Sequence, residues 1–217
     1  MKIVTLVNGS LRGKKASSTR FLNDLSRRID EGKYQKIFLS VKANYRVDYS
    51  FQMLEALGRS DAVVFVFPLY GYGLPGAMTR LLEDFRNHPR SDVEMRDPAK
   101  VYAIINCGFP RPEMTCQEAI RVVKHFCRAS GFKWRFAISI GAGPVVAMTS
   151  RLPLLDRKLK RAFSALASDL DPNDKPVEDY FIRPLLPEIV IRKIKESCEK
   201  RGRMIVDRGS VNSTKDE

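Results

Sequence analysis

Apolar residues along the chain form five short runs of strand length, separated by segments with helical periodicity. The runs cover residues 2–8, 36–41, 62–67, 100–106 and 134–140. They are rich in Val, Ile and Phe, and several are apolar on both faces, as is typical of strands covered by helices on each side. The pattern therefore predicts a parallel sheet.

Three segments between these runs repeat apolar residues at intervals of three or four. They cover residues 17–31, 75–86 and 114–130. The first begins at two serines that can cap a helix and ends before Gly32, and the second has Pro75 in its first turn. Because strands and helices alternate, the sequence predicts a doubly wound α/β sheet.

The last third of the chain has a different pattern. Residues 151–170 predict a helix, and residues 185–202 predict a second, amphipathic helix. The polar residues 206–217 carry no apolar face. We therefore expect an α/β domain over 1–145, a helical C-terminal extension over 146–205 that packs on it, and a flexible tail.

Charge limits the class of protein. The chain has 38 Lys and Arg against 25 Asp and Glu, a formal net charge of +13. These cations are spread along the chain, and aromatic residues do not alternate with them as a base-stacking surface requires, so we expect no specific nucleic-acid binding. A membrane-surface role for the basic helix at 151–170 stays open.

No apolar run reaches the roughly 20 residues that span a bilayer, and no signal peptide is recognisable. A cytoplasmic protein is therefore expected.

The cysteines carry little site chemistry on their own. They are Cys107, Cys116, Cys127 and Cys198, and no two form a C-x-x-C pair. This argues against zinc ribbons, iron–sulfur clusters and a disulfide framework, so reduced thiols and no bound metal are expected. Cys107 follows a predicted strand. It is either a nucleophile or a packing residue, and the absence of a nearby histidine favours packing.

Ligands of open parallel sheets bind at the carboxyl ends of the strands, where the strand order reverses. Three loops meet this description. They are "NGSLRGKKASST" at 8–19, "PLYGYGLPG" at 68–76 and "NCGFPRPE" at 106–113.

The first loop combines glycines, hydroxyl groups and cations just before a predicted helix. A helix amino terminus offers free N–H groups and the positive end of the helix dipole, which bind phosphate. The loop is not a triphosphate loop, because "GSLRGKK" is one residue shorter than G-x-x-x-x-G-K-[ST] and ends in lysine instead of a magnesium-binding hydroxyl. A phosphate site is favoured over the alternative, a polar surface turn with a serine cap.

The second loop contains a formal G-x-G-x-x-G, at Gly71, Gly73 and Gly76. We reject a dinucleotide fingerprint, because that motif belongs after the first strand and needs an acidic residue at the end of the next strand. Tyr70 and Tyr72 instead suggest a wall for a flat aromatic ligand. The alternative is that both tyrosines pack against a helix or a partner subunit. In the third loop, Gly108 permits close approach and the N–H groups before Pro110 can meet the polar edge of a heterocycle.

Taken together, these loops give residues 1–145 a resemblance to the flavodoxin-like family of NAD(P)H-dependent FMN reductases and quinone or nitro-compound oxidoreductases. "NGSLRGKKASST" is similar to that family's G-S-x-R-x-x-S-x-T loop for the FMN phosphate. "PLYGYGLPGAMTRLLEDF" is similar to its P-x-Y-x-x-x-x-P loop and following helix, and "INCGFPRPE" to the loop after strand four. Iron–sulfur members carry a cysteine cluster after strand two, which "SVKANYRVDYSF" lacks, so that branch is excluded.

The resemblance implies three groups of site residues. The FMN phosphate would be held by Ser10, Arg12, Ser17, Ser18 and Thr19. The ribityl chain and isoalloxazine would be flanked by Pro68, Leu69, Tyr70, Gly71 and Tyr72, and the polar edge of the ring would be met by Asn106, Cys107, Gly108 and Phe109. The first loop is longer than the family's, so it stays open whether Ser17 or Ser18 contacts the phosphate.

The resemblance also implies a flavodoxin-like five-stranded parallel sheet in the order 2-1-3-4-5 and a homodimer. The implied function is an FMN-dependent NAD(P)H oxidoreductase, which passes electrons from NADPH or NADH through FMN to a small acceptor such as a quinone, a flavin, or a nitro or azo compound. Because the flavin carries the reaction, no catalytic side chain is expected.

Two other functions stay open. One is a flavodoxin-type electron carrier without NAD(P)H activity, although the basic charge and the added C-terminal residues argue against it. The other is a nucleic-acid or scaffold protein that kept the fold without the flavin.

Overall fold

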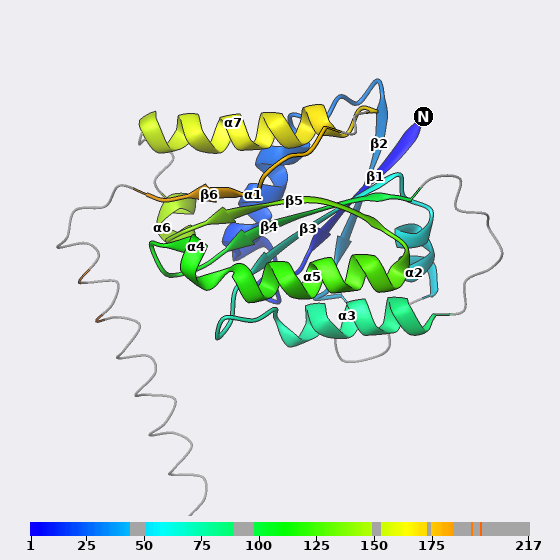
Figure 1. Cartoon of the computed structure of the whole chain (residues 1–217), viewed down its shortest axis with the longest axis horizontal. Coiled ribbons are helices and arrows are strands. Elements are labelled where there is room, and N and C mark those ends of the chain that lie inside the picture. Colours follow the sequence, from blue (N-terminus) through cyan, green and yellow to red (C-terminus); the bar gives the residue numbers. More distant parts are fainter. Residues whose placement is uncertain are drawn as a thin grey trace, which may run out of the picture. The chain divides into compact units, whose positions relative to one another are not determined.

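In the computed structural model of the chain, six strands form one sheet in the order β2-β1-β3-β4-β5-β6, and every neighbouring pair is parallel. They are β1 (Lys2–Asn8), β2 (Tyr34–Ser40), β3 (Ala62–Pro68), β4 (Lys100–Asn106), β5 (Lys133–Ile140) and β6 (Tyr180–Ile182). The predicted parallel α/β sheet is confirmed (Figure 1). The expectation of five strands was wrong, because β6 pairs with the end of β5.

The structure describes residues 1–43, 51–88, 98–148, 153–172 and 175–184, together with Arg192 and Glu196, which are helical. Met1–Pro184 form one compact unit, which contains all six strands, and Leu185–Glu217 form a second. Apart from Arg192 and Glu196, the helix expected at 185–202 lies outside the described residues. The same is true of the tail expected at 206–217 and of Cys198.

Helices cover both faces of the sheet, and Figure 1 shows α7 on the opposite side of the sheet from α3 and α5. One face packs against α1 (Ser17–Ser26) and α7 (Pro153–Asp169). The other packs against α2 (Phe51–Gly58), α3 (Gly76–Asn87) and α5 (Gln117–Ser130). The connections contain η1 (Gly13–Lys15), α4 (Pro112–Thr115) and α6 (Gly143–Met148). The helix predicted over 114–130 is thus divided at Cys116, and α2 is one that the pattern did not predict.

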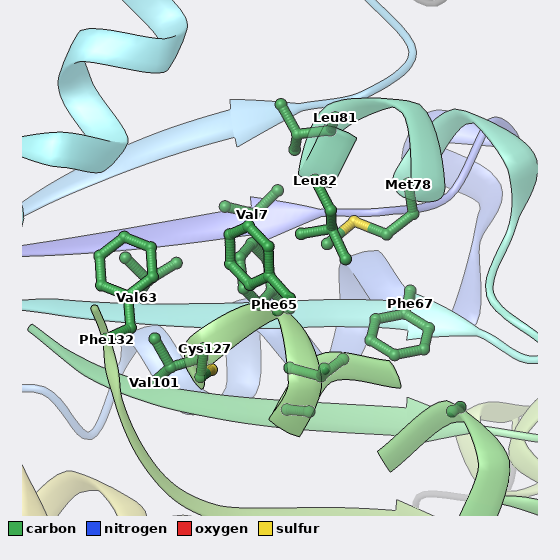
Figure 2. Packing of buried hydrophobic residues seen from close by; sticks show 14 of the residues in the cluster. Val7, Val63, Phe65, Phe67, Met78, Leu81, Leu82, Val101, Cys127 and Phe132 are labelled. Carbon is green, nitrogen blue, oxygen red and sulfur yellow. The ribbon is translucent and has the colours of Figure 1, made fainter. Parts of the chain in front are cut away.

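The strand β3 lies in the middle of the core and is apolar at nearly every position for that reason. Val63, Phe65 and Phe67 face the layer shared with α3, where Met78, Leu81 and Leu82 pack (Figure 2). Val64 and Val66 face the other layer. Each large side chain buried in this way contributes about 1.5–3 kcal/mol. The ends of the central strands, which carry the predicted site, therefore rest on a firmly packed base.

A buried ion pair holds the end of α7 against β4 and β5. Arg135 donates two 2.7 Å hydrogen bonds to the Asp169 carboxylate, and the Tyr102 hydroxyl donates to the same carboxylate at 2.9 Å. The side chains of Arg135 and Asp169 are 6% and 3% exposed. Because both charges are buried, loss of either one is expected to destabilise the fold strongly.

The segment after β5 is not purely helical. It supplies α6 and α7 and then returns to the sheet as β6, so the expected helical extension is not confirmed. None of the helices within the described ranges has the length and apolar character needed to cross a membrane.

Candidate functional site

The first loop is folded by its own side chains. Asn8 uses both ends of its amide, because Oδ1 accepts from the N–H of Ser10 at 3.0 Å and Nδ2 donates to Thr19 Oγ1 at 2.8 Å. The Thr19 hydroxyl donates in turn to the carbonyl of Gly13 at 2.7 Å. Gly13 has φ of 58°, in the left-handed region that glycine adopts without strain. These hydrogen bonds preorganise the loop around the start of α1.

The start of α1 offers the N–H groups of Ser17 and Ser18 as donors, whereas the N–H of Thr19 bonds to the carbonyl of Ala16 at 3.1 Å. Its N-cap residue is Ala16, which supplies no side-chain cap. The first N–H groups of a helix have no partner within it, and the helix dipole adds to their attraction for an anion. The exposed cations Arg12, Lys14 and Lys15 precede this turn, and half-buried Ser17 opens it. Such a donor set suits a phosphate group.

Ser18 lies at the same turn, but its hydroxyl faces inward. Asn106 Nδ2 donates to Ser18 Oγ at 2.8 Å and to the carbonyl of Phe67 at 3.0 Å. Ser18 and Asn106 are only 1% and 4% exposed. Ser17 is therefore the more accessible of the two serines, and Asn106 connects the first loop with the ends of β3 and β4.

Lys42 lies beside the first loop although it follows β2. A Cβ placed on Gly13 would be 3.3 Å from Lys42 Nζ. The N–H of Val41 donates to the carbonyl of Asn8 at 3.1 Å, so the carboxyl ends of β1 and β2 lie next to each other. Sequence reasoning missed Lys42 because it considered only the loops after the first, third and fourth strands. The available signal was the strand order, which places β2 next to β1.

The second loop contains a tight turn that exposes two tyrosines. The N–H and the carbonyl of Tyr70 both bond to Gly73, each at 3.0 Å. Gly71 and Tyr72 have φ of 53° and 66°, as both central residues of a type I′ turn do. A residue with a side chain, such as Tyr72, is less stable in this left-handed backbone conformation by about 1–2 kcal/mol. Backbone strain of this kind concentrates at functional sites. Tyr70 and Tyr72 are 48% and 53% exposed. Pro68 and Leu69, which precede the turn, are half-buried.

The third loop meets the second through an aromatic pair. The rings of Phe109 and Tyr72 are stacked, with centroids 5.8 Å apart and planes 13° from parallel. The N–H of Leu69 donates to the carbonyl of Asn106 at 2.8 Å, so the backbones are joined as well. The N–H of Gly108 bonds to no residue of the described ranges. It is available to a ligand beside the aromatic wall formed by Tyr72 and Phe109.

The glycines show where the loops leave room. A Cβ placed on Gly71 or Gly108 would meet no heavy atom within 4 Å. A Cβ on Gly141 would instead lie 2.5 Å from the carbonyl oxygen of Pro110, and one on Gly143 would lie 2.8 Å from the Cβ of Asn106. The third loop is therefore tightly packed against the segment after β5 and open at Gly108.

Cys107 belongs to a pair of thiols, which the sequence did not reveal. The thiol of Cys116, at the junction of α4 and α5, hydrogen-bonds to the sulfur of Cys107. The Thr115 hydroxyl donates to Cys107 Sγ at 3.4 Å. These bonds, that from Cys116 above all, hold the pKa of Cys107 below that of an ordinary thiol, although burial opposes them. The same hydrogen bond, together with burial, raises the pKa of Cys116. Cys127, in the core, has its pKa raised to about 12 by burial.

Comparison with known proteins bears on the fold. The sequence matches no protein-family model and no curated protein. The structure is similar to that of an azoreductase from Bacillus anthracis str. Sterne, with 15% identity, 78% of this chain and 98% of the other covered, and a TM-score of 0.53. It is also similar to general stress protein 14 from Treponema denticola in complex with FMN, with 12% identity, 79% and 100% coverage, and a TM-score of 0.58.

A third similar structure is an NAD(P)H:quinone oxidoreductase from Methanothermobacter marburgensis, with 12% identity, 82% of this chain and 99% of the other covered, and a TM-score of 0.58. Identities this low concern the arrangement of the backbone only. The chain therefore has the flavodoxin-like fold of these proteins, with six strands in its sheet.

Proposed function

We propose that the chain is an FMN-dependent NAD(P)H oxidoreductase that passes electrons from NADPH or NADH to a small acceptor such as a quinone, a flavin, or a nitro or azo compound. The observation that carries this proposal is the bond between Asn106 and Ser18, which ties the start of α1, our candidate phosphate site, to the end of β4, where the third loop begins. Two of the similar structures are an azoreductase and a quinone oxidoreductase, and a third contains FMN, which supports the same chemistry.

The residues of the first loop fit the phosphate of FMN. A phosphate monoester carries a charge of about −1.5 to −2 near neutral pH. Arg12 and Ser17, beside the N–H groups of α1, are the side chains that we assign to direct contact, with Lys42 as an additional cation. The hydroxyls of Ser10, Ser18 and Thr19 accept or donate hydrogen bonds inside the chain, so we assign them to holding the backbone in place.

The residues of the other two loops fit a flat heterocycle. Gly71 and Gly108 leave space, and the N–H of Gly108 offers a donor to the polar edge of a ring. The exposed faces of Tyr70, Tyr72 and Phe109 would be covered by the ring or by a second copy of the chain in a homodimer. Pro68 and Leu69 would flank the ribityl chain.

The chain's own part in the reaction is binding and orientation. A bound flavin would supply the hydride and electron chemistry, as cofactors of this kind do. No side chain of the site then needs to act as an acid or a base. The buried free thiols of Cys107, Cys116 and Cys127 fit a reducing compartment, and we place the protein in the cytoplasm.

Flavin binding and reduction test the proposal in two steps. The purified protein is titrated with FMN, and quenching of the flavin fluorescence is followed. The loaded protein is then mixed anaerobically with NADPH or NADH, and bleaching of the flavin absorbance is recorded before quinones, nitroaromatics, azo dyes and free flavin are added. Protein that binds no FMN would overturn the proposal. Protein that binds FMN but is bleached by neither nucleotide would be an electron carrier instead.

A further inference from the structure

Cys107 and Cys116 place two thiols around the hydroxyl of Thr115, next to the proposed flavin site. Cys107 follows the last residue of β4, and Cys116 lies between α4 and α5. The hydroxyl of Thr115 bridges them, at 3.4 Å from Cys107 Sγ and 3.8 Å from Cys116 Sγ. Both cysteines are free and buried.

We propose that Cys107 and Cys116 are a redox-active dithiol that a hydroperoxide oxidises to an intramolecular disulfide. The inference stands on the position of the two sulfurs, which both lie within 3.8 Å of Thr115 Oγ1, and does not rest on the proposed function.

The oxidation is a two-electron exchange in two steps. The Cys107 thiolate attacks one oxygen of hydrogen peroxide, the O–O bond breaks, and the second oxygen leaves as hydroxide and takes up a proton to form water. Cys107 is then a sulfenic acid. The sulfur of Cys116 attacks the sulfur of Cys107, the S–O bond breaks, and the departing hydroxide leaves as water with the proton of Cys116. Two thiols and one peroxide thus give one disulfide and two waters.

The surroundings assign the two roles. Cys107 is the attacking thiol, because the hydroxyl of Thr115 donates to its sulfur at 3.4 Å, which favours the thiolate, the nucleophilic form of cysteine. Cys107 is 2% exposed, and its neighbour Gly108 borders open space, from which a small oxidant would have to approach. Cys116 is fully buried, so we assign it as the thiol that resolves the sulfenic acid and gives up its proton to the departing hydroxide. Cys127 has a raised pKa, and its burial makes it an internal control.

The disulfide would act on the site through Phe109. It would close a ring from the end of β4 to the beginning of α5, and Phe109 lies inside that ring. Because Phe109 stacks on Tyr72, oxidation of the pair would restrict the aromatic wall. The state of the two cysteines is thereby coupled to the shape of the site.

The test needs only the full-length protein. Fully reduced protein is treated with hydrogen peroxide, denatured, alkylated at its remaining thiols, and digested without reduction. We expect an intact mass that has lost two hydrogens and a cross-linked peptide that joins Cys107 to Cys116, with Cys127 alkylated. Cys107 and Cys116 both recovered as alkylated thiols would overturn the inference. So would a cross-link that joins either one to another cysteine.

Two variants separate the roles of the thiols. Cys116→Ser should stop at a sulfenic acid on Cys107, which dimedone traps, and Cys127→Ser should form the same cross-link as the original chain. Cross-linking that survives in Cys116→Ser would contradict the assignment. Circular dichroism shows whether each variant is folded. If a variant does not fold, the cross-linked peptides of the unaltered chain still show whether Cys107 and Cys116 form a disulfide. If the protein forms the cross-link but binds no FMN, the dithiol inference holds and the proposed function is wrong.

Discussion

Asn106 at the end of β4 donates a 2.8 Å hydrogen bond to Ser18 Oγ in the first turn of α1, across 88 positions of sequence. Its second amide hydrogen bonds to the carbonyl of Phe67 at the end of β3. One buried amide therefore sets the distance between the start of α1 and the ends of two strands. The phosphate end and the ring end of the proposed site depend on it together.

Asn106→Ala removes this connection. It leaves the Phe67 carbonyl without its side-chain donor and takes away the amide bonded to Ser18, and an unsatisfied buried polar group costs about 1–3 kcal/mol. We expect a loss of that size in the free energy of unfolding, measured with urea. Asn23 is exposed on α1, so Asn23→Ala should change the value by less than about 0.5 kcal/mol. Equal effects of the two variants would show that the amide of Asn106 has no special role.

The cation of the first loop is the next target. Arg12→Gln combined with Ser17→Ala removes a charge and a hydroxyl next to the start of α1. Because each charge-assisted hydrogen bond is worth about 1.5–3 kcal/mol, we expect FMN affinity to fall at least about tenfold. The measurement is flavin fluorescence quenching. Arg27, at the opposite end of α1, provides a control with the same change of charge, and Arg27→Gln should leave the affinity unchanged.

Gly108 allows a test by added bulk. A Cβ at this position meets no atom within 4 Å, so Gly108→Val should keep the thermal midpoint of the protein within a few degrees. The valine side chain would occupy the open space beside the aromatic wall, and FMN affinity should fall by an order of magnitude or more. A variant with normal stability and normal affinity would place the ring elsewhere.

Asp169 and Arg135 test the attachment of α7. Asp169→Asn removes the negative charge of a buried ion pair, and breaking such a pair costs about 3–5 kcal/mol. Tyr102→Phe keeps both charges and removes the hydrogen bonds of the hydroxyl to the carboxylate of Asp169 at 2.9 Å and to its main-chain carbonyl at 3.1 Å, which should cost about 1–2 kcal/mol. Urea unfolding measures both. The exposed pair of Arg121 and Glu118 is the control, because Glu118→Gln should change stability by less than about 1 kcal/mol.

The pH dependence of Cys107 follows from its donors. A hydrogen bond to a thiolate favours the charged form and lowers the pKa, so removal of the donor must raise it. Cys116→Ala and Thr115→Val should each move the titration of Cys107 to higher pH, with the larger shift in Cys116→Ala. Ultraviolet absorbance of the thiolate against pH measures the shift. A titration that moves to lower pH in either variant would contradict the assignment of donors.

The parts of the fold that could be predicted are those set by local pattern. The strands β1, β3, β4 and β5 are buried over most of their length because they lie between two layers of helices, and this character is visible in the sequence. The edge strand β2 is mostly half-buried or exposed, and it was located from its apolar residues alone. The strand β6 has only three residues, and its pairing with Ile138–Ile140 depends on a long-range contact. The short helix α2 also escaped, although Met53, Leu54 and Leu57 are buried.

Much the same division holds for the candidate site. The three loops could be located, because strand ends and glycine-rich turns are local features. The inward direction of Ser18, the contact of Lys42 with the first loop, and the pairing of Cys107 with Cys116 could not. Each of these is a meeting of residues that only the assembled sheet brings together.

Gly141 and Gly143, the two glycines after β5, can be used to identify similar chains from their sequences. Gly141 and Gly143 are required by main-chain and Cβ contacts with Pro110 and Asn106, whatever ligand the site holds. The sequence of a loop that contacts a ligand can differ between proteins that bind different ligands. Contacts this close at Gly141 and Gly143 instead leave no room for a side chain at either position. A pattern that joins Asn-Cys-Gly at 106–108 to Gly-Ala-Gly at 141–143 would therefore pick out chains built in this way, even where overall identity has fallen to the 12% seen for two of the similar structures.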